Sequence, residues 1–159
     1  MREIGEVDYL LPGTITPARQ FASIAVDADL PTLMGGTVQP LVGPVGAPKI
    51  SGQDAFINRM GVGLTPLVAW TAPAVGTPTR YELSLFQLGI SAMKTTKTPV
   101  ATIITPEVQV QLPPGLLQPA TKYFLLIFAI AEPNRNELRP FIPTLPSGHA
   151  VVLSGIFEP

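Results

Sequence analysis

Apolar and polar residues alternate along much of the chain after residue 53, and this alternation predicts β-strands. In the stretch RYELSLFQL, Tyr81, Leu83 and Leu85 fall on one face and charged or polar side chains on the other. The stretch EVQVQL, at residues 107–112, alternates in the same way. No run of 11 or more residues shows a convincing helical period, so the pattern predicts an all-β chain.

Apolar runs bounded by turn residues complete the set of predicted elements. Residues 1–20 carry mixed charge and two Pro, and we expect a poorly ordered lead-in there. Residues 91–98 are polar and are expected to form a loop. About seven short strands separated by turn signals are typical of an immunoglobulin-like sandwich. The further strands are predicted within residues 21–30, 54–60, 65–73, 100–105, 123–130 and 149–157.

Residues 31–52 are dense in Pro and Gly, with short apolar clusters between them. This composition predicts an extended connector that packs on the domain, because a flexible linker would be polar and rich in Ser and Gly. Pro at this density argues against a helix or a central strand. We therefore predict an N-terminal extension at residues 1–52 and a sandwich domain at residues 53–159.

Two segments contain different motifs that point to the same kind of domain. PLVAWTAP, followed by YELSL, places Trp70 near the end of a strand and before a turn that contains Pro. VQVQLPPGLLQPATKYFLLIFAIAE places Leu117, Pro119, Thr121 and Tyr123 in the pattern Leu-x-Pro-x-Thr-x-Tyr, ahead of an apolar strand. Together these segments resemble the second, third, fifth and sixth strands of a fibronectin type III domain, over about residues 53–157.

The resemblance implies an immunoglobulin-like, fibronectin type III β-sandwich with the N-terminal segment packed on one sheet. It also implies a tyrosine corner, in which the Tyr123 ring fills the edge of the core and its hydroxyl bonds backbone a few residues upstream. Trp70 is expected to plug the core. The residues assigned structural roles are Trp70, Tyr81, Leu117, Pro119 and Tyr123.

The strand YFLLIFAI is apolar on both faces. If Tyr123 starts the core face, the opposite face carries four large apolar side chains, and such a patch is either covered or an interface. We expect residues 21–50 to cover it, with FASIAVDADL adding a strand. The alternative is a docking face for a neighbouring domain or a second copy, which would form a homodimer. Its candidate residues are Phe86, Leu88, Phe124, Leu126, Phe128 and Ile130.

Composition excludes several classes of partner and site. Only 13% of the residues are charged and the net charge is -1, so nothing marks the chain for nucleic acid or an acidic membrane surface. The absence of Cys excludes disulfides and thiolate metal sites. No stretch approaches the roughly 20 apolar residues of a membrane span. The N-terminus does not resemble a signal peptide, and the composition favours a piece of a longer extracellular or cell-envelope protein over a cytoplasmic one.

Few residues suggest catalysis or metal binding. His149 is the single His, and no nucleophile or carboxylate partner stands out, so we expect a strand-edge position for it. Asp27 and Asp29 could bind Ca²⁺ together with backbone carbonyls, but a solvated strand end is the expected arrangement. The stretches MGGT and GVG lack the Lys and the helix of a phosphate loop. We predict no catalytic residue, no metal and no cofactor.

The loop PNRNELRP, at residues 133–140, is the most charged short stretch and would join the last two strands of the sandwich. Such loops often bind partners, although a solvated loop is the expected state. The candidate binding residues are Asn134, Arg135, Asn136, Glu137 and Arg139.

The predicted function is a non-catalytic interaction or spacer module that contacts a protein partner or a neighbouring domain. The alternative is a carbohydrate- or surface-binding accessory module of a secreted enzyme, which would need exposed aromatic side chains in a planar row. Fold alone does not assign function, so the two remain to be separated by the site.

Overall fold

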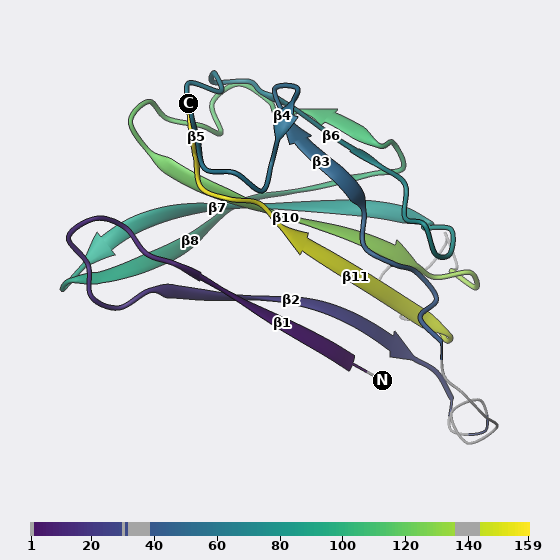
Figure 1. Ribbon diagram of the computed structural model, residues 1–159. Coiled ribbons are helices and arrows are strands. Elements are labelled where there is room, and N and C mark those ends of the chain that lie inside the picture. The colour runs from purple at the N-terminus through teal and green to yellow at the C-terminus, as the bar shows by residue number, and fades with distance from the viewer. Residues whose placement is uncertain (1, 30, 32–38, 136–143) are drawn as a thin grey trace.

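The computed structural model describes residues 2–29, 31, 39–135 and 144–159, and these residues fold into two packed β-sheets (Figure 1). The larger sheet runs in the order β1, β2, β11, β10, β7, β8, and β12 and β5 extend it beside β10. The smaller sheet runs β4, β3, β6, β9. The strands of the larger sheet are β1 (Arg2–Tyr9), β2 (Ala18–Asp27), β5 (Arg59–Met60), β7 (Arg80–Ser91), β8 (Lys94–Thr105), β10 (Lys122–Ala131), β11 (Ser147–Leu153) and β12 (Phe157–Glu158). Those of the smaller sheet are β3 (Gly46–Ile50), β4 (Gln53–Asp54), β6 (Leu67–Thr71) and β9 (Gln109–Gln111). The predicted all-β sandwich is confirmed.

The main core lies between the two sheets and uses the alternation seen in the sequence. β7 turns Tyr81, Leu83 and Leu85 inward, and all three are buried. They face Val68 and Trp70 of β6, whose intervening residues are more exposed. The Trp70 and Tyr81 rings meet edge to face with centroids 5.2 Å apart, a favourable arrangement for two aromatic quadrupoles.

The turn before β10 forms the corner that the sequence pattern predicts. The Gln118 backbone N–H donates a hydrogen bond of 2.9 Å to the Tyr123 hydroxyl oxygen. Leu117 is buried beneath this turn, and the Thr121 hydroxyl bonds the Pro119 carbonyl oxygen at 3.3 Å. Ala120 adopts a positive φ of 56°, which lets the chain reverse within this short segment. The turn thereby fixes where β10 enters the core.

Replacing Tyr123 with Phe tests this corner. The substitution keeps the ring, which packs beside Phe157, and removes only the hydroxyl that accepts from Gln118. We expect the free energy of unfolding to fall by about 0.5–1.5 kcal/mol, the usual net worth of one such hydrogen bond. Urea unfolding of both proteins measures the change, and coincident unfolding curves would contradict the corner.

Residues 2–20 do not form a poorly ordered lead-in, and that expectation is wrong. β1 pairs with β2 along its whole length, and β3 occupies an inner position of the smaller sheet between β4 and β6. Pro48 is tolerated in β3 because the register with β6 shifts between Gly46 and Lys49, so the missing N–H falls at a bulge. Both sheets thus take strands from the described part of residues 2–52.

Two other predicted elements also differ. The polar stretch 91–98 is not a loop, because β7 and β8 form one long hairpin that turns at Ala92 and Met93. The Thr and Lys residues at the start of β8 are polar, which is typical of a loop. They form a strand because pairing with β7 supplies their backbone hydrogen bonds. The predicted strand at 54–60 reduces to the two short strands β4 and β5.

The β1–β2 hairpin folds across the outer face of the larger sheet and builds a second core (Figure 1). β2 pairs with β11 at its far end, as expected for FASIAVDADL, and the hairpin then crosses toward β8. Its residues Tyr9, Leu11 and Ala18 bury against Phe124 of β10. Cover therefore comes from residues 9–22, whereas Val42 of the later segment packs in the main core.

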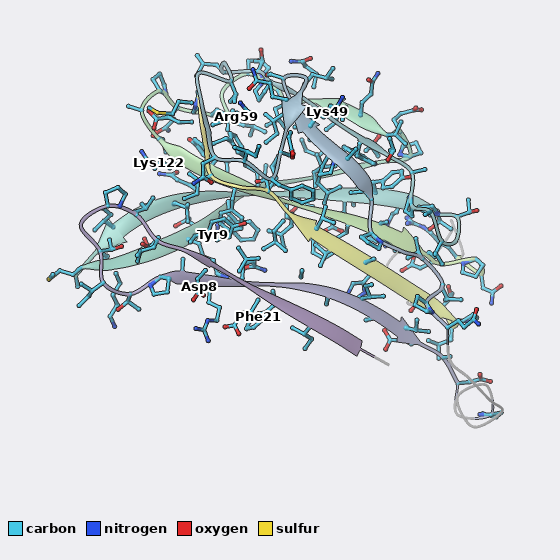
Figure 2. All side chains as sticks on the ribbon, in the orientation of Figure 1. Asp8, Tyr9, Phe21, Lys49, Arg59 and Lys122 are labelled. Carbon is cyan, nitrogen blue, oxygen red and sulfur yellow. The ribbon has the colours of Figure 1, made fainter. Side chains whose placement is uncertain are left out.

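Polar contacts fasten the hairpin at both edges of the sheet it covers. The Tyr9 hydroxyl donates to the Ser154 carbonyl oxygen at 2.6 Å within the buried interior, and Figure 2 labels Tyr9 between the hairpin and the sheet. Near the turn, the Leu11 N–H donates to Thr95 Oγ1 at 3.0 Å, and the Thr14 and Thr95 hydroxyls lie 2.8 Å apart. Buried polar groups are thus paired on both sides of the apolar contact.

Candidate functional site

The predicted apolar docking face is covered by the chain itself. Leu88, Phe124 and Leu126 are buried, with Phe124 fully inaccessible. Phe86 and Phe128 are partly buried against the same cluster, and Ile130 is half-buried. The docking alternative, including a homodimer through the face that contains Phe124, therefore lacks exposure at Leu88, Phe124 and Leu126. The burial agrees with the expectation of an intramolecular cover.

The predicted binding loop is described only in part. Asn136, Glu137 and Arg139 lie outside the described residues. The Asn134 side-chain amide donates to the Leu145 carbonyl oxygen at 2.8 Å, which joins the two ends of the loop. Arg135 lies 4.0 Å from the Glu132 carboxylate. Both residues therefore make contacts within the chain.

Glu132 is held by Arg80 at the base of this loop. The Arg80 guanidinium contacts both carboxylate oxygens, one of them at 3.3 Å, and both side chains are largely buried. The hydrogen bond from Arg80 lowers the pKa of Glu132, and burial opposes that change. This fork-shaped pair ties β7 to the end of β10, and it fits a structural role.

The residues considered for chemistry do not converge. His149 Nε2 lies 3.5 Å from Ser23 Oγ, which is longer than a good hydrogen bond. Its ring tilts against Phe128 on the outer face of the sheet. Within the described residues, no cluster of three or more His, Cys, Asp or Glu side chains could hold a metal ion. Asp27 is exposed at the end of β2, in line with a solvated strand end.

An apolar groove opens where β2 and β11 separate. β2 pairs with β11 only along Ser147–Ala150. Beyond that point the hairpin swings away over the sheet, and Val151–Leu153 of β11 are left as the floor of a hollow of about 440 Å³. The hollow follows directly from the geometry of the hairpin, because a strand that crosses a sheet cannot also pair along its edge.

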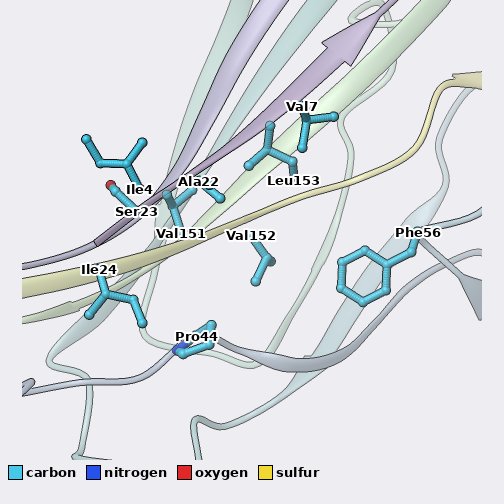
Figure 3. Close-up of a pocket in the computed structure, with 11 residues that line it drawn as sticks. Ile4, Val7, Ala22, Ser23, Ile24, Pro44, Phe56, Val151, Val152 and Leu153 are labelled. Carbon is cyan, nitrogen blue, oxygen red and sulfur yellow. The ribbon is translucent and has the colours of Figure 1, made fainter. Parts of the chain in front are cut away.

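The two walls of this groove come from distant parts of the sequence. Figure 3 shows Ile4 and Val7 of the hairpin on one side of Val152, and Pro44 and Phe56 on the other. Ile4 and Phe56 are each 54% exposed. Phe56 is held in place by the turn that its N–H makes with the Asp54 carboxylate, at 2.9 Å. The exposed apolar groups therefore face one another across a shared hollow.

Two further hollows, of about 430 and 380 Å³, continue the groove along β12. They lie between the end of β1 and the segment that leads into β5, with Leu10 on one wall and Met60 on the other. Both of these side chains are exposed. The residues shared between successive hollows are Val7, Phe56 and Leu153, and then Leu10, Asn58 and Ile156.

The far end of the groove is charged. Lys122 pairs with Glu158 at 3.0 Å, and Arg59 lines the same hollow (Figure 2). The Arg59 Nε is buried and has no hydrogen-bond partner, and no carboxylate of the described residues forms an ion pair with Arg59. This end of the groove therefore carries a cation without an acidic partner among the described residues.

Sequence reasoning missed this groove. Its walls lie in residues 1–20, which looked like a lead-in, and in DAFINRM, which looked like a strand. The available signal was the adjacent pair Phe56–Ile57 between polar residues, because both side chains cannot face the same core. Both are exposed in the structure.

Comparison with known proteins returned no match to any family model and no match among curated proteins. In the part of the chain that the structure describes, no helix has the length and apolar character needed to cross a membrane.

Proposed function

We propose that this chain is a non-catalytic protein-interaction module of a larger extracellular or cell-envelope protein, built on a fibronectin type III-like sandwich. The strand arrangement supports this proposal: β3, β6 and β9 form one sheet of the sandwich and β8, β7, β10 and β11 the other. The hydrogen bond to the Tyr123 hydroxyl supports it further. The β1–β2 hairpin is an addition to that sandwich.

The apolar groove is the observation that carries the proposal. Monomeric proteins rarely leave large apolar side chains gathered on the surface, and a gathered set rimmed by polar residues marks an interaction site. Here Ile4, Phe56 and Met60 are all more than half exposed and line connected hollows. The loops and edge strands of a sandwich can carry such a binding surface while the core stays rigid.

The carbohydrate-binding alternative has weaker support. Flat aromatic platforms are usually built from Trp and Tyr, whose rings are amphipathic. The single Trp and all three Tyr are described, and each is at most 5% exposed. Phe21 and Phe56 are the exposed aromatic residues within the described ranges, and they lie on different elements.

Selection from a random library of decapeptides on the immobilised full chain tests the proposal. We expect enriched peptides whose binding is lost in Phe56→Glu and Ile4→Glu. The matched control is Ile104→Glu, which alters an exposed Ile on the edge strand β8 outside the groove. Enrichment that survives both groove variants, or binding only on a glycan array, would overturn the proposal.

A further inference from the structure

We propose that the groove binds an extended segment of a partner protein, which adds as a strand to the free edge of β1 and places an acidic group at Arg59. This inference rests on the proposed function and specifies its ligand. Strand addition combines main-chain hydrogen bonds with pockets for alternate side chains. The structure offers both features at the same place.

The free edge of β1 faces the groove at residues 7–10. At the start of β1, β2 lies between β1 and β11, because Ile24 pairs with both Glu3 and Ala150. Among the described strands, β1 pairs only with β2. β2 lies on the β8 side, because the Lys97 ammonium of β8 donates to the Arg19 carbonyl oxygen of β2 at 2.6 Å. The opposite edge of β1 must therefore point toward the other wall, and residues 7–10 indeed share a hollow with Phe56 and Asn58.

The groove has the length and the lining of a strand site. Residues 7–10, at the end of β1 and in its following turn, run beside it, which corresponds to about 14 Å at roughly 3.4 Å per residue. An added strand of about four residues would fill this length and direct alternate side chains toward the apolar floor. The floor residues Val151 and Leu153 are themselves one strand repeat apart.

The edge of β8, the other outer strand, is protected against strand addition. β8 carries Pro99 and Lys97, and its pairing with β7 has an irregular register, all of which discourage edge-to-edge addition. On β1, Glu6 and Asp8 are instead engaged by Arg19 of β2. Arg19 thereby offsets one of these two negative charges within the hairpin.

Charge at the end of the groove sets one position of the ligand. Arg59 is the cation there without an acidic partner among the described residues, whereas the neighbouring Lys122 is paired with Glu158. A carboxylate on the partner segment would complement the positive charge of Arg59. We therefore expect ligands with apolar residues at alternate positions followed by an Asp or a Glu.

The experiment uses the decapeptides selected on the full chain and measures their affinity by fluorescence anisotropy. Methylation of every second backbone nitrogen of the peptide removes donors from one edge only. We expect one methylation register to weaken binding at least tenfold and the other to be tolerated. On ¹⁵N-labelled protein, bound peptide is expected to protect amides of β1, but not amides of β8, from hydrogen exchange.

Arg59→Gln provides the matched test of the charged end. This substitution should lower the affinity of acidic peptides at least tenfold. The affinity of the matching peptides with Asn or Gln in place of the acidic residue should change by no more than twofold. If peptides bind in a manner that depends on Phe56 but tolerate both methylation registers, strand addition is overturned and the interaction function stands. If no peptide depends on Phe56, both proposals fail. Self-association that disappears in Ile4→Glu would identify a second copy of the chain as the occupant and overturn a separate partner.

Discussion

Replacing Phe124 with Ala is expected to lower the free energy of unfolding by about 3–5 kcal/mol, a range typical of a fully buried Phe. Phe124 is completely inaccessible, although it lies on the sheet face opposite the main core. Its ring stacks with Tyr9 at a centroid distance of 4.2 Å and with Phe86 at 5.1 Å. The substitution would empty the centre of the second core.

Phe21→Ala is the control for this variant. Phe21 lies on β2 and is 44% exposed, so its loss is expected to change stability by no more than about 0.5 kcal/mol. Urea unfolding followed by circular dichroism compares the three proteins. Equal stabilities for the two variants would mean that the hairpin does not cover Phe124 in solution.

Tyr9→Ala is expected to destabilise the fold to a similar degree, by about 3–5 kcal/mol. The substitution removes both the ring that stacks on Phe124 and the hydroxyl that donates to the buried Ser154 carbonyl. Burial also raises the pKa of the Tyr9 hydroxyl well above its ordinary value, so this donor stays protonated at neutral pH. Tyr9→Phe should cost only about 0.5–1.5 kcal/mol, because it deletes the hydrogen bond alone.

A double-mutant cycle with Phe124→Ala tests the contact directly. Two stacked aromatic rings are expected to couple by about 0.5–1.5 kcal/mol. If Tyr9→Ala has no effect, the hairpin is an appendage, as residues 1–20 appear from the sequence. A large effect with no coupling would place Tyr9 in the fold but away from Phe124.

The same region shows where sequence reasoning succeeded and where it failed. The two-faced apolar character of YFLLIFAI correctly indicated that something must cover the sheet. The cover was sought in residues 21–50, where apolar clusters are dense, yet Tyr9, Leu11 and Ala18 supply most of it. Their spacing over a strand, a turn and a second strand forms no continuous apolar run, so no local pattern marks them.

The groove was harder to predict from the sequence than the cover over the sheet. Its walls join residues 4–10 to residues 56–60, and its floor is residues 151–158. Each piece alone resembles an ordinary loop or a short strand. The exposed side chains of Ile4 and Phe56 become a shared surface only when the hairpin crosses the sheet and leaves the edge of β11 open.

The sequence by itself determined the all-β class, the inward faces of the main core strands and the corner at Tyr123. These features depend on alternation and turn chemistry, which act between neighbouring residues. The tertiary structure decided the path of residues 2–27, the burial of Phe124 and the existence of the groove. Those outcomes depend on apolar contacts between segments that are far apart in the sequence. Hydrophobic burial is not directional, so its partners are fixed only when the whole chain has packed.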